Sequence, residues 1–272
     1  MTNSTRSPEE QIWRSITSLD AWLDENGWAG YDPYDLKGMK FYLGLAQQRG
    51  FASLPVRIVR KVLVHLENQH PFWTRRLLGV RQQINPKGMG LFARGYLDLY
   101  QTSSEEQFKE KALVCLDWLT ENPAEGYSGT CWGYPFDWRS VIFIPKGTPS
   151  AVVSSVVGDA FWRAYEVLAD ERHLEICESI CQFILNDLNI DEMDDSAVCF
   201  SYTPLDDFHV HNANLFVAEF LTRVGSKLNN SKYLEWGQRA ADYALQEQKP
   251  DGSLNYWGVV QDQHSPGHID HY

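Results

Sequence analysis

Apolar residues along most of this chain recur every three or four positions, which is the spacing of amphipathic helices. One such series consists of Ile176, Ile180 and Ile184. Capping residues mark the helix starts, as at Thr148, which Pro149 follows in the first helical position. No alternating apolar and polar run of strand length interrupts these segments. The pattern therefore predicts an all-helical protein.

Three of the predicted helices repeat one another along the chain. They begin near Phe108, His173 and Tyr233, and in each of them an aromatic residue follows ten positions later. The starts are separated by 65 and 60 residues. Each of these helices follows a second helical pattern and precedes a polar loop rich in aromatic residues, so the repeating unit is a helical hairpin with a loop. The preceding helical patterns lie over residues 89–100, 152–168 and 213–224.

Two helices cannot bury both of their apolar faces alone, so successive hairpins must stack side by side. Small residues in the first helix of each pair suit a crowded inner layer, and the amphipathic second helices suit an outer layer. We therefore predict a single α/α-toroid domain over residues 1–272. A leading helix at about 9–26, four hairpins and the start of another helix at 267–272 give about nine or ten helices. A complete ring of six hairpins needs more, so we predict an incomplete, C-terminally truncated ring.

Composition and charge narrow the range of partners. The net charge of −12 repels nucleic acid and anionic membrane surfaces, and no run approaches the roughly 20 apolar residues that span a bilayer. The polar N-terminus lacks the apolar stretch of a secretory signal, which favours a cytoplasmic protein. The five cysteines form no CxxC pair, so we interpret them as reduced core thiols. We expect no metal, no cofactor, no nucleic-acid partner and no membrane partner, and the oligomeric state is left open.

The loops carry the candidate binding residues. Aromatic residues make up 13% of the chain, and many of its ten tryptophans lie beside glycine, proline or aspartate. In a ring of hairpins the loops that lead into the inner helices emerge at one end, where aromatic faces stack on sugar rings and carboxylates accept bonds from sugar hydroxyls. The alternative is that these rings plug the barrel and that acidic residues such as Asp35 and Asp207 only cap helices. The predicted substrate-binding residues are Tyr31, Tyr34, Trp132, Tyr134, Trp138, Lys146, Tyr202, His209, Asn212, Trp257 and His268.

Two kinds of catalysis are open to these loops. A pair of carboxylates can cleave a glycosidic bond, with Asp137 and Asp206 as the preferred pair and Asp32 in reserve. A histidine, with His211 as the candidate, can instead abstract a proton from a sugar carbon, as epimerases do. For His209, His211, His268 and His271, metal binding and a plain core position are the alternatives. The candidate partners for a uronate carboxylate are Lys87, Arg139 and Lys146.

Three stretches of loop sequence, at 132–138, 143–149 and 200–214, are similar to those of a known group of proteins. From about residue 85 onward the chain resembles the six-hairpin glycosidase-like superfamily of α/α toroids, and within it a poorly characterised family associated with polysaccharide biosynthesis. The resemblance extends more distantly to N-acylglucosamine 2-epimerases and glucuronyl C5-epimerases. It implies a ring of helical hairpins and a role in carbohydrate metabolism, but it fixes no reaction, because such toroids host several chemistries.

Three functional hypotheses follow. The first is a carbohydrate-active protein that acts on a sugar or a uronate-containing glycan by epimerisation or glycosidic cleavage. The second is a non-catalytic glycan-binding or assembly protein in polysaccharide biosynthesis, which the predicted truncation favours. The third is a prenyltransferase-type or cyclase-type toroid, for which the acidic run at residues 191–195 is the only sequence feature.

Overall fold

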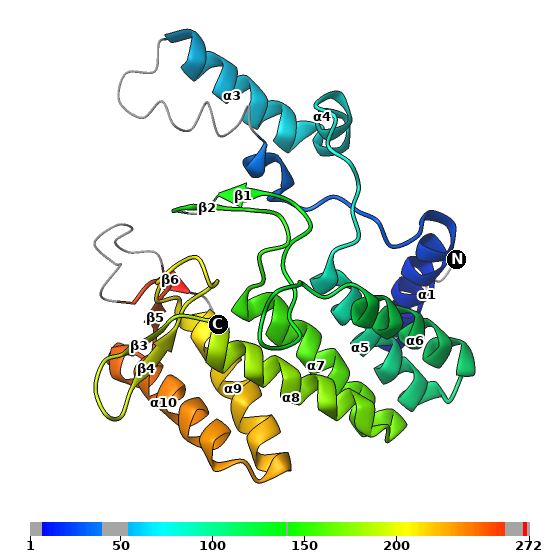
Figure 1. Ribbon diagram of the computed structural model, residues 1–272. Coiled ribbons are helices and arrows are strands. Elements are labelled where there is room, and N and C mark those ends of the chain that lie inside the picture. Colours follow the sequence, from blue (N-terminus) through cyan, green and yellow to red (C-terminus); the bar gives the residue numbers. More distant parts are fainter. Residues whose placement is uncertain (1–6, 40–53, 140, 259–268, 271–272) are drawn as a thin grey trace.

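The protein is a row of helical hairpins in two layers (Figure 1). The computed structural model describes residues 7–39, 54–139, 141–258 and 269–270. Three inner helices pack in the order α5, α7 and α9, and an outer helix packs against each of them, which confirms the predicted repeat and the α/α-toroid fold. The inner helices are α5 (Pro86–Ser103), α7 (Ala151–Leu168) and α9 (His211–Leu228), and the outer helices are α6 (Glu106–Glu121), α8 (Glu171–Asp187) and α10 (Ser231–Glu247).

The predicted leading helix is confirmed as α1 (Pro8–Asn26). A capping box between Ser7 and Glu10 fixes its start. Its carboxylate at Asp20 accepts hydrogen bonds from the Tyr96 hydroxyl and the Lys111 ammonium, at 2.8 and 2.6 Å, so α1 is tied to α5 and α6. The chain then forms η1 (Asp35–Gly38), α3 (Leu54–Gln69) and α4 (Pro71–Leu77), of which α3 and α4 lie apart from the two helical layers (Figure 1).

Short antiparallel ribbons lie in the loops that lead into or follow the hairpins. They are β1 (Trp138–Arg139) with β2 (Phe143–Ile144), β3 (Ile190–Glu192) with β4 (Val198–Phe200), and β5 (Leu254–Asn255) with β6 (Ile269–Asp270). The prediction that residues 267–272 begin another helix is wrong for Ile269 and Asp270, because the backbones of these two residues pair with β5 as a strand. The other residues of that segment lie outside the described part of the chain.

Each inner helix ends on a residue with left-handed backbone conformation. These residues are Ser104, Ala169 and Asn229, with φ angles of 60°, 55° and 51°. The amide N–H of each donates to the carbonyl four residues earlier, and the next residue is the N-cap of the outer helix. The intervals between these three residues equal the intervals between the starts of the three repeated helices predicted from the sequence. A turn of this kind closes each hairpin tightly, which aligns the inner and outer helices.

A substitution at the second of these turns tests its geometry. Ala169 is exposed, so Ala169→Gly removes little packing, and glycine adopts a positive φ without the steric cost that alanine has there. We expect the free energy of unfolding to rise by about 1 kcal/mol in urea titrations. Ala21→Gly, at an exposed position inside α1, is the matched control and should lower it by about 1 kcal/mol. Equal signs for the two changes would contradict the turn geometry.

The apolar faces of both layers form one continuous core. Phe161, Phe183 and Phe220 lie at its centre with no exposed surface. All five cysteines are free and buried, as predicted, and burial raises the pKa of Cys115 and Cys131 to about 12. These thiols are therefore protonated and unreactive at neutral pH.

Candidate functional site

The loops that lead into the inner helices meet beside the N-terminal ends of α7 and α9. The amide of Ala151, at the start of α7, donates to the carbonyl of Tyr202 in the loop before α9, at 2.9 Å. Val210, just before α9, forms an isolated bridge with Trp257, which follows α10. These connections bring segments more than 100 positions apart in the chain together around a cavity of about 430 Å³, which we call the larger cavity.

Aromatic side chains dominate the wall of the larger cavity. Edge-to-face contacts join Trp138 to Tyr134 and to Tyr202, each with ring centroids 5.8 Å apart. Tyr256 and Trp257 make a similar contact at 5.0 Å on the C-terminal side. Such contacts hold the rings in fixed orientations, so the wall is preorganised. The aromatic lining residues are Tyr34, Tyr134, Phe136, Trp138, Tyr202, Phe208, Tyr256 and Trp257.

Two cations also line the larger cavity. Lys87 comes from the first turn of α5 and Arg139 from β1. Both side chains are half-buried, and within the described residues neither forms a salt bridge, in contrast to Arg75, whose guanidinium lies 2.9 Å from the carboxylate of Asp35. A ligand with a negative charge could therefore gain two charge-assisted contacts here.

Asp206 is the carboxylate in this wall, and its own loop holds it. It is 6% exposed, and its oxygens accept hydrogen bonds from the backbone amides of Tyr202, Thr203 and Phe208 and from the Thr203 hydroxyl. Burial raises the pKa of Asp206, and these hydrogen bonds oppose the rise. The carboxylate thus shapes the loop between β4 and α9, and four donors already occupy its oxygens.

The hydroxyl groups of Tyr134 and Tyr202 form a pair at the centre of the wall. Burial raises the pKa of both phenols, and the hydrogen bond between them lowers the pKa of Tyr134 while raising that of Tyr202. Both residues are therefore protonated at neutral pH. One hydroxyl of the pair donates in their mutual hydrogen bond, so the pair offers one O–H donor toward a ligand.

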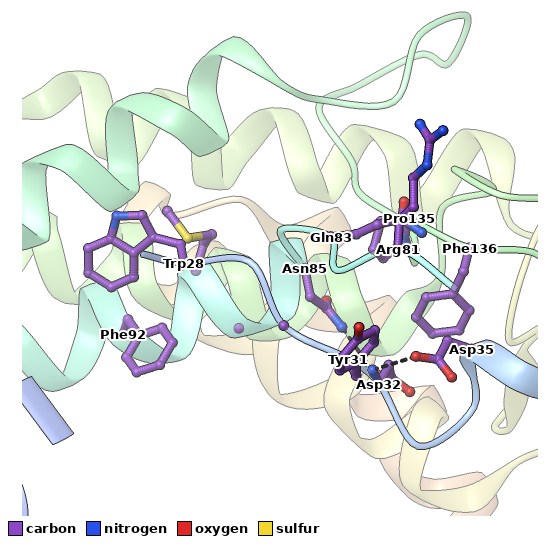
Figure 2. A pocket seen from close by; sticks show the side chains of 13 residues that line it. Trp28, Tyr31, Asp32, Asp35, Arg81, Gln83, Asn85, Phe92, Pro135 and Phe136 are labelled. Carbon is purple, nitrogen blue, oxygen red and sulfur yellow. Dashed lines mark hydrogen bonds between the residues drawn. The ribbon is translucent and has the colours of Figure 1, made fainter. Parts of the chain in front are cut away.

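Asp32 and Tyr31 lie in a second cavity of about 220 Å³, which we call the smaller cavity (Figure 2). It lies between the loop before η1 and the first turns of α5. Burial raises the pKa of Asp32, whose oxygens accept bonds from the Tyr34 amide at 2.9 Å and the Asn85 side chain at 3.1 Å. Phe136 lines both cavities, so the two are neighbours across one ring.

The histidines His209 and His211 belong to a buried hydrogen-bond network. The Tyr243 hydroxyl lies 3.0 Å from Nδ1 of His209 and donates to Glu247 at 3.0 Å, and Nε2 of His211 lies 3.0 Å from the other Glu247 oxygen. His209 and His211 are 2% and 1% exposed, and neither lines the larger cavity. Asp191 extends the network from β3 at 3.0 Å. This network joins α9, α10 and β3. It agrees with the alternative that the two histidines are core residues.

Four further predicted residues lie away from both cavities or outside the described chain. Trp132 is 1% exposed, and its indole N–H donates to the carbonyl of Leu119 at 3.0 Å, so it is a core residue and we do not carry it into the site. Asp137 is exposed and accepts a bond from the backbone amide of Lys146, itself exposed, at 2.7 Å. His268 lies outside the described residues.

The structure thus brings together nine predicted residues in the larger cavity and two in the smaller one. The predicted trio of Asp137, Asp206 and His211 is not assembled, because the first is exposed and the last is buried in the Tyr243 network. Sequence reasoning missed Phe136 and Phe208, although both lie beside predicted loop residues. The nine are Tyr34, Lys87, Tyr134, Trp138, Arg139, Tyr202, Asp206, Asn212 and Trp257, and the two are Tyr31 and Asp32.

The described residues include neither a candidate metal site nor a membrane-spanning helix. No group of three histidine, cysteine, aspartate or glutamate side chains among them is placed to hold a metal ion. Over the same part of the chain, no helix is long and apolar enough to cross a membrane.

Fold and site together define an α/α toroid with an aromatic, cation-bearing cavity. No family model and no curated protein matches the chain. Among solved structures, the Lin0763 protein from Listeria innocua is similar, with a TM-score of 0.50 and 15% identity over 74% of this chain and 50% of that one. For a D-mannose isomerase the TM-score is 0.49 and the identity is 15%, over 68% of this chain and 49% of that one. For a polysaccharide lyase the TM-score is 0.47 and the identity is 14%, over 95% of this chain and 78% of that one. The chain spans about half the length of the first two, and at such identities the likeness is one of fold alone, a layered array of helical hairpins.

Proposed function

We propose that the larger cavity binds an acidic sugar residue of a glycan. The observation that carries this proposal is the combination of eight aromatic rings with two cations in one cavity of about 430 Å³. Aromatic faces stack on the CH faces of sugars, and planar guanidinium groups pair with carboxylates. A uronate offers both a ring to stack and a carboxylate to pair with Lys87 or Arg139.

The described residues favour binding over turnover. Cleavage of a glycosidic bond uses two carboxylates, and within the described chain Asp206 is the carboxylate in the larger cavity, with its oxygens already bonded. Epimerisation needs a base, but burial raises the pKa of Tyr134 and Tyr202 and keeps both phenols protonated. We therefore propose a glycan-binding or assembly role, with epimerisation and glycosidic cleavage as the alternatives.

Isothermal titration calorimetry with free sugars tests the proposal. Glucuronic and galacturonic acid should bind, glucose and galactose should bind at least about tenfold more weakly, and the acidic sugars should be recovered unchanged by NMR. Binding of benzoate in place of the uronates would point to an aromatic acid as the ligand. Conversion of the sugar to an epimer or an unsaturated product would instead support an enzyme.

Two variants locate the contacts. Trp138→Ala removes a stacking face, and Lys87→Met removes a charge while keeping most of the side-chain length. Each should weaken uronate binding by at least about tenfold, the size of a typical anchor residue in a binding site. The matched controls are Trp22→Ala, at an exposed position of α1, and Lys109→Met, at a half-buried position of α6 that lines neither cavity, and both should leave binding unchanged. Equal affinity of Trp138→Ala and the wild type would contradict the stacking role.

A further inference from the structure

The smaller cavity is built from the same three segments that form one side of the larger one. The loop before η1 contributes Asp32 to the smaller cavity and Tyr34 to the larger. The first turn of α5 contributes Gly88 to the smaller cavity and Lys87 to the larger. The ring of Phe136 forms part of both walls. A ligand held in the larger cavity therefore has a second, preformed cavity directly beside it.

The smaller cavity has both a stacking surface and polar groups. On one side, the ring centroids of Trp28 and Phe92 lie 5.4 Å apart. Tyr31 lies on the other side, beside Asp32 (Figure 2). The polar lining of this cavity includes the carboxylate of Asp32 and the side-chain amide of Gln83. With about 220 Å³, this space suits one small ring and not an extended chain.

The charges of the two cavities differ in a way that predicts different ligands. In the smaller cavity, Asp35 is neutralised by Arg75 at 2.9 Å, and the guanidinium of Arg81 is exposed and points away from both carboxylates (Figure 2). Asp32 forms no salt bridge within the described residues, and its two oxygens accept hydrogen bonds from neutral amide groups, although Lys87 and Arg75 lie near enough to lower its pKa through their charge. A second acidic sugar would be repelled here, whereas sugar hydroxyls can donate to this carboxylate.

We infer that the smaller cavity is a second sugar subsite that takes a neutral unit next to the acidic unit in the larger cavity. This inference rests on the proposed function of the larger cavity and specifies its ligand. The ligand is then a glycan in which a uronate is linked to a neutral hexose or N-acetylhexosamine, and an all-uronate chain is a poor ligand. Asp32, which the sequence analysis held in reserve for a catalytic pair, acts here as a hydrogen-bond acceptor for the neutral sugar.

Calorimetry with three probes on the full chain tests the inference. The probes are glucuronic acid, a hyaluronan disaccharide of glucuronate and N-acetylglucosamine, and digalacturonic acid. We expect the mixed disaccharide to bind roughly tenfold more tightly than the monosaccharide, and the all-acidic disaccharide to gain nothing. Asp32→Asn and Gln83→Ala should each remove the gain for the mixed disaccharide without weakening the binding of glucuronic acid.

The possible outcomes distinguish failure of the proposed function from failure of the second subsite. Absence of any uronate binding by the wild type overturns the proposed function and the second subsite together. Uronate binding without a gain from the neutral unit overturns the second subsite alone, as does a gain that persists in both variants. Because Asp32→Asn alters a loop contact with Asn85, thermal unfolding must match the wild type before its affinity is interpreted, and Gln83→Ala provides an independent test.

Discussion

Replacement of Trp132 by alanine is expected to destabilise the protein by about 3–5 kcal/mol, the usual cost of removing a large aromatic side chain from a core. The side chain is 1% exposed, and its ring packs against Phe161 with centroids 5.9 Å apart. Its N–H donates to the carbonyl of Leu119, so truncation also leaves a buried acceptor without its partner. The indole thus connects the loop before α7 to the end of α6.

Urea unfolding followed by circular dichroism measures this loss. Trp138→Ala is the matched comparison, because its ring is half-buried in the cavity wall and its loss should cost less stability and more ligand affinity. If Trp132→Ala unfolds at the wild-type urea concentration, the core position of the ring is wrong. If the folded variant loses uronate binding as strongly as Trp138→Ala does, the original stacking prediction for Trp132 is restored.

Gly129→Ala is expected to destabilise the protein by about 3 kcal/mol, at the upper end of the cost of overpacking. A Cβ atom at this position would lie 1.9 Å from the carbonyl oxygen of Ser179 and 2.6 Å from the amide nitrogen of Phe183. Both atoms belong to the backbone of α8, so neither can rotate out of the way. The loop must then move off α8 and lose the bond from the Thr130 amide to the Ser179 hydroxyl, 2.9 Å long.

Gly95→Ala is the control for this substitution. Gly95 lies inside α5, and a Cβ atom there meets nothing within 4 Å. Because alanine favours a helix over glycine, the control should raise the free energy of unfolding by roughly 0.5–1 kcal/mol. Similar destabilisation by both alanines would show that the close approach of the loop to α8 does not exist.

The helical repeat could be predicted because it depends on local spacing alone. Ile176, Ile180 and Ile184 give their helix face directly, and Ile180 and Ile184 are fully buried in α8. Of the three residues that end the inner helices, Asn229 is a type that tolerates a left-handed turn, whereas Ser104 and Ala169 give no such local signal. The strand at Ile269 and Asp270 could not be predicted, because it depends on pairing with residues 254–255 across a long loop.

The candidate site was only partly predictable, for a physical reason. Loop aromatics cluster near one end in any toroid, but whether a ring lines a cavity or fills the core depends on which way its backbone turns. Trp132 and Trp138 lie six positions apart in one loop, yet the first packs against Phe161 and the second faces the larger cavity. The composition of the loop does not distinguish Trp132 from Trp138.

The histidines illustrate the same limit over a longer range. His209 and His211 were separated in the sequence from Tyr243 and Glu247 by more than 30 positions. Their hydrogen bonds form because α9 and α10 pack antiparallel, which brings the start of one helix beside the end of the other. The sequence separation of two residues does not show that they are close in space.

The row of hairpins also bears on how the protein is made. The principal helix contacts lie within each hairpin or join it to the next one in the row, from α5 and α6 to α9 and α10. A hairpin that leaves the ribosome can therefore dock on the one already folded, without waiting for distant C-terminal residues. The larger cavity is the exception, because the segment after α10 supplies Tyr256 and Trp257. The helical layers can assemble during synthesis, whereas the binding wall is completed only when its last segment arrives.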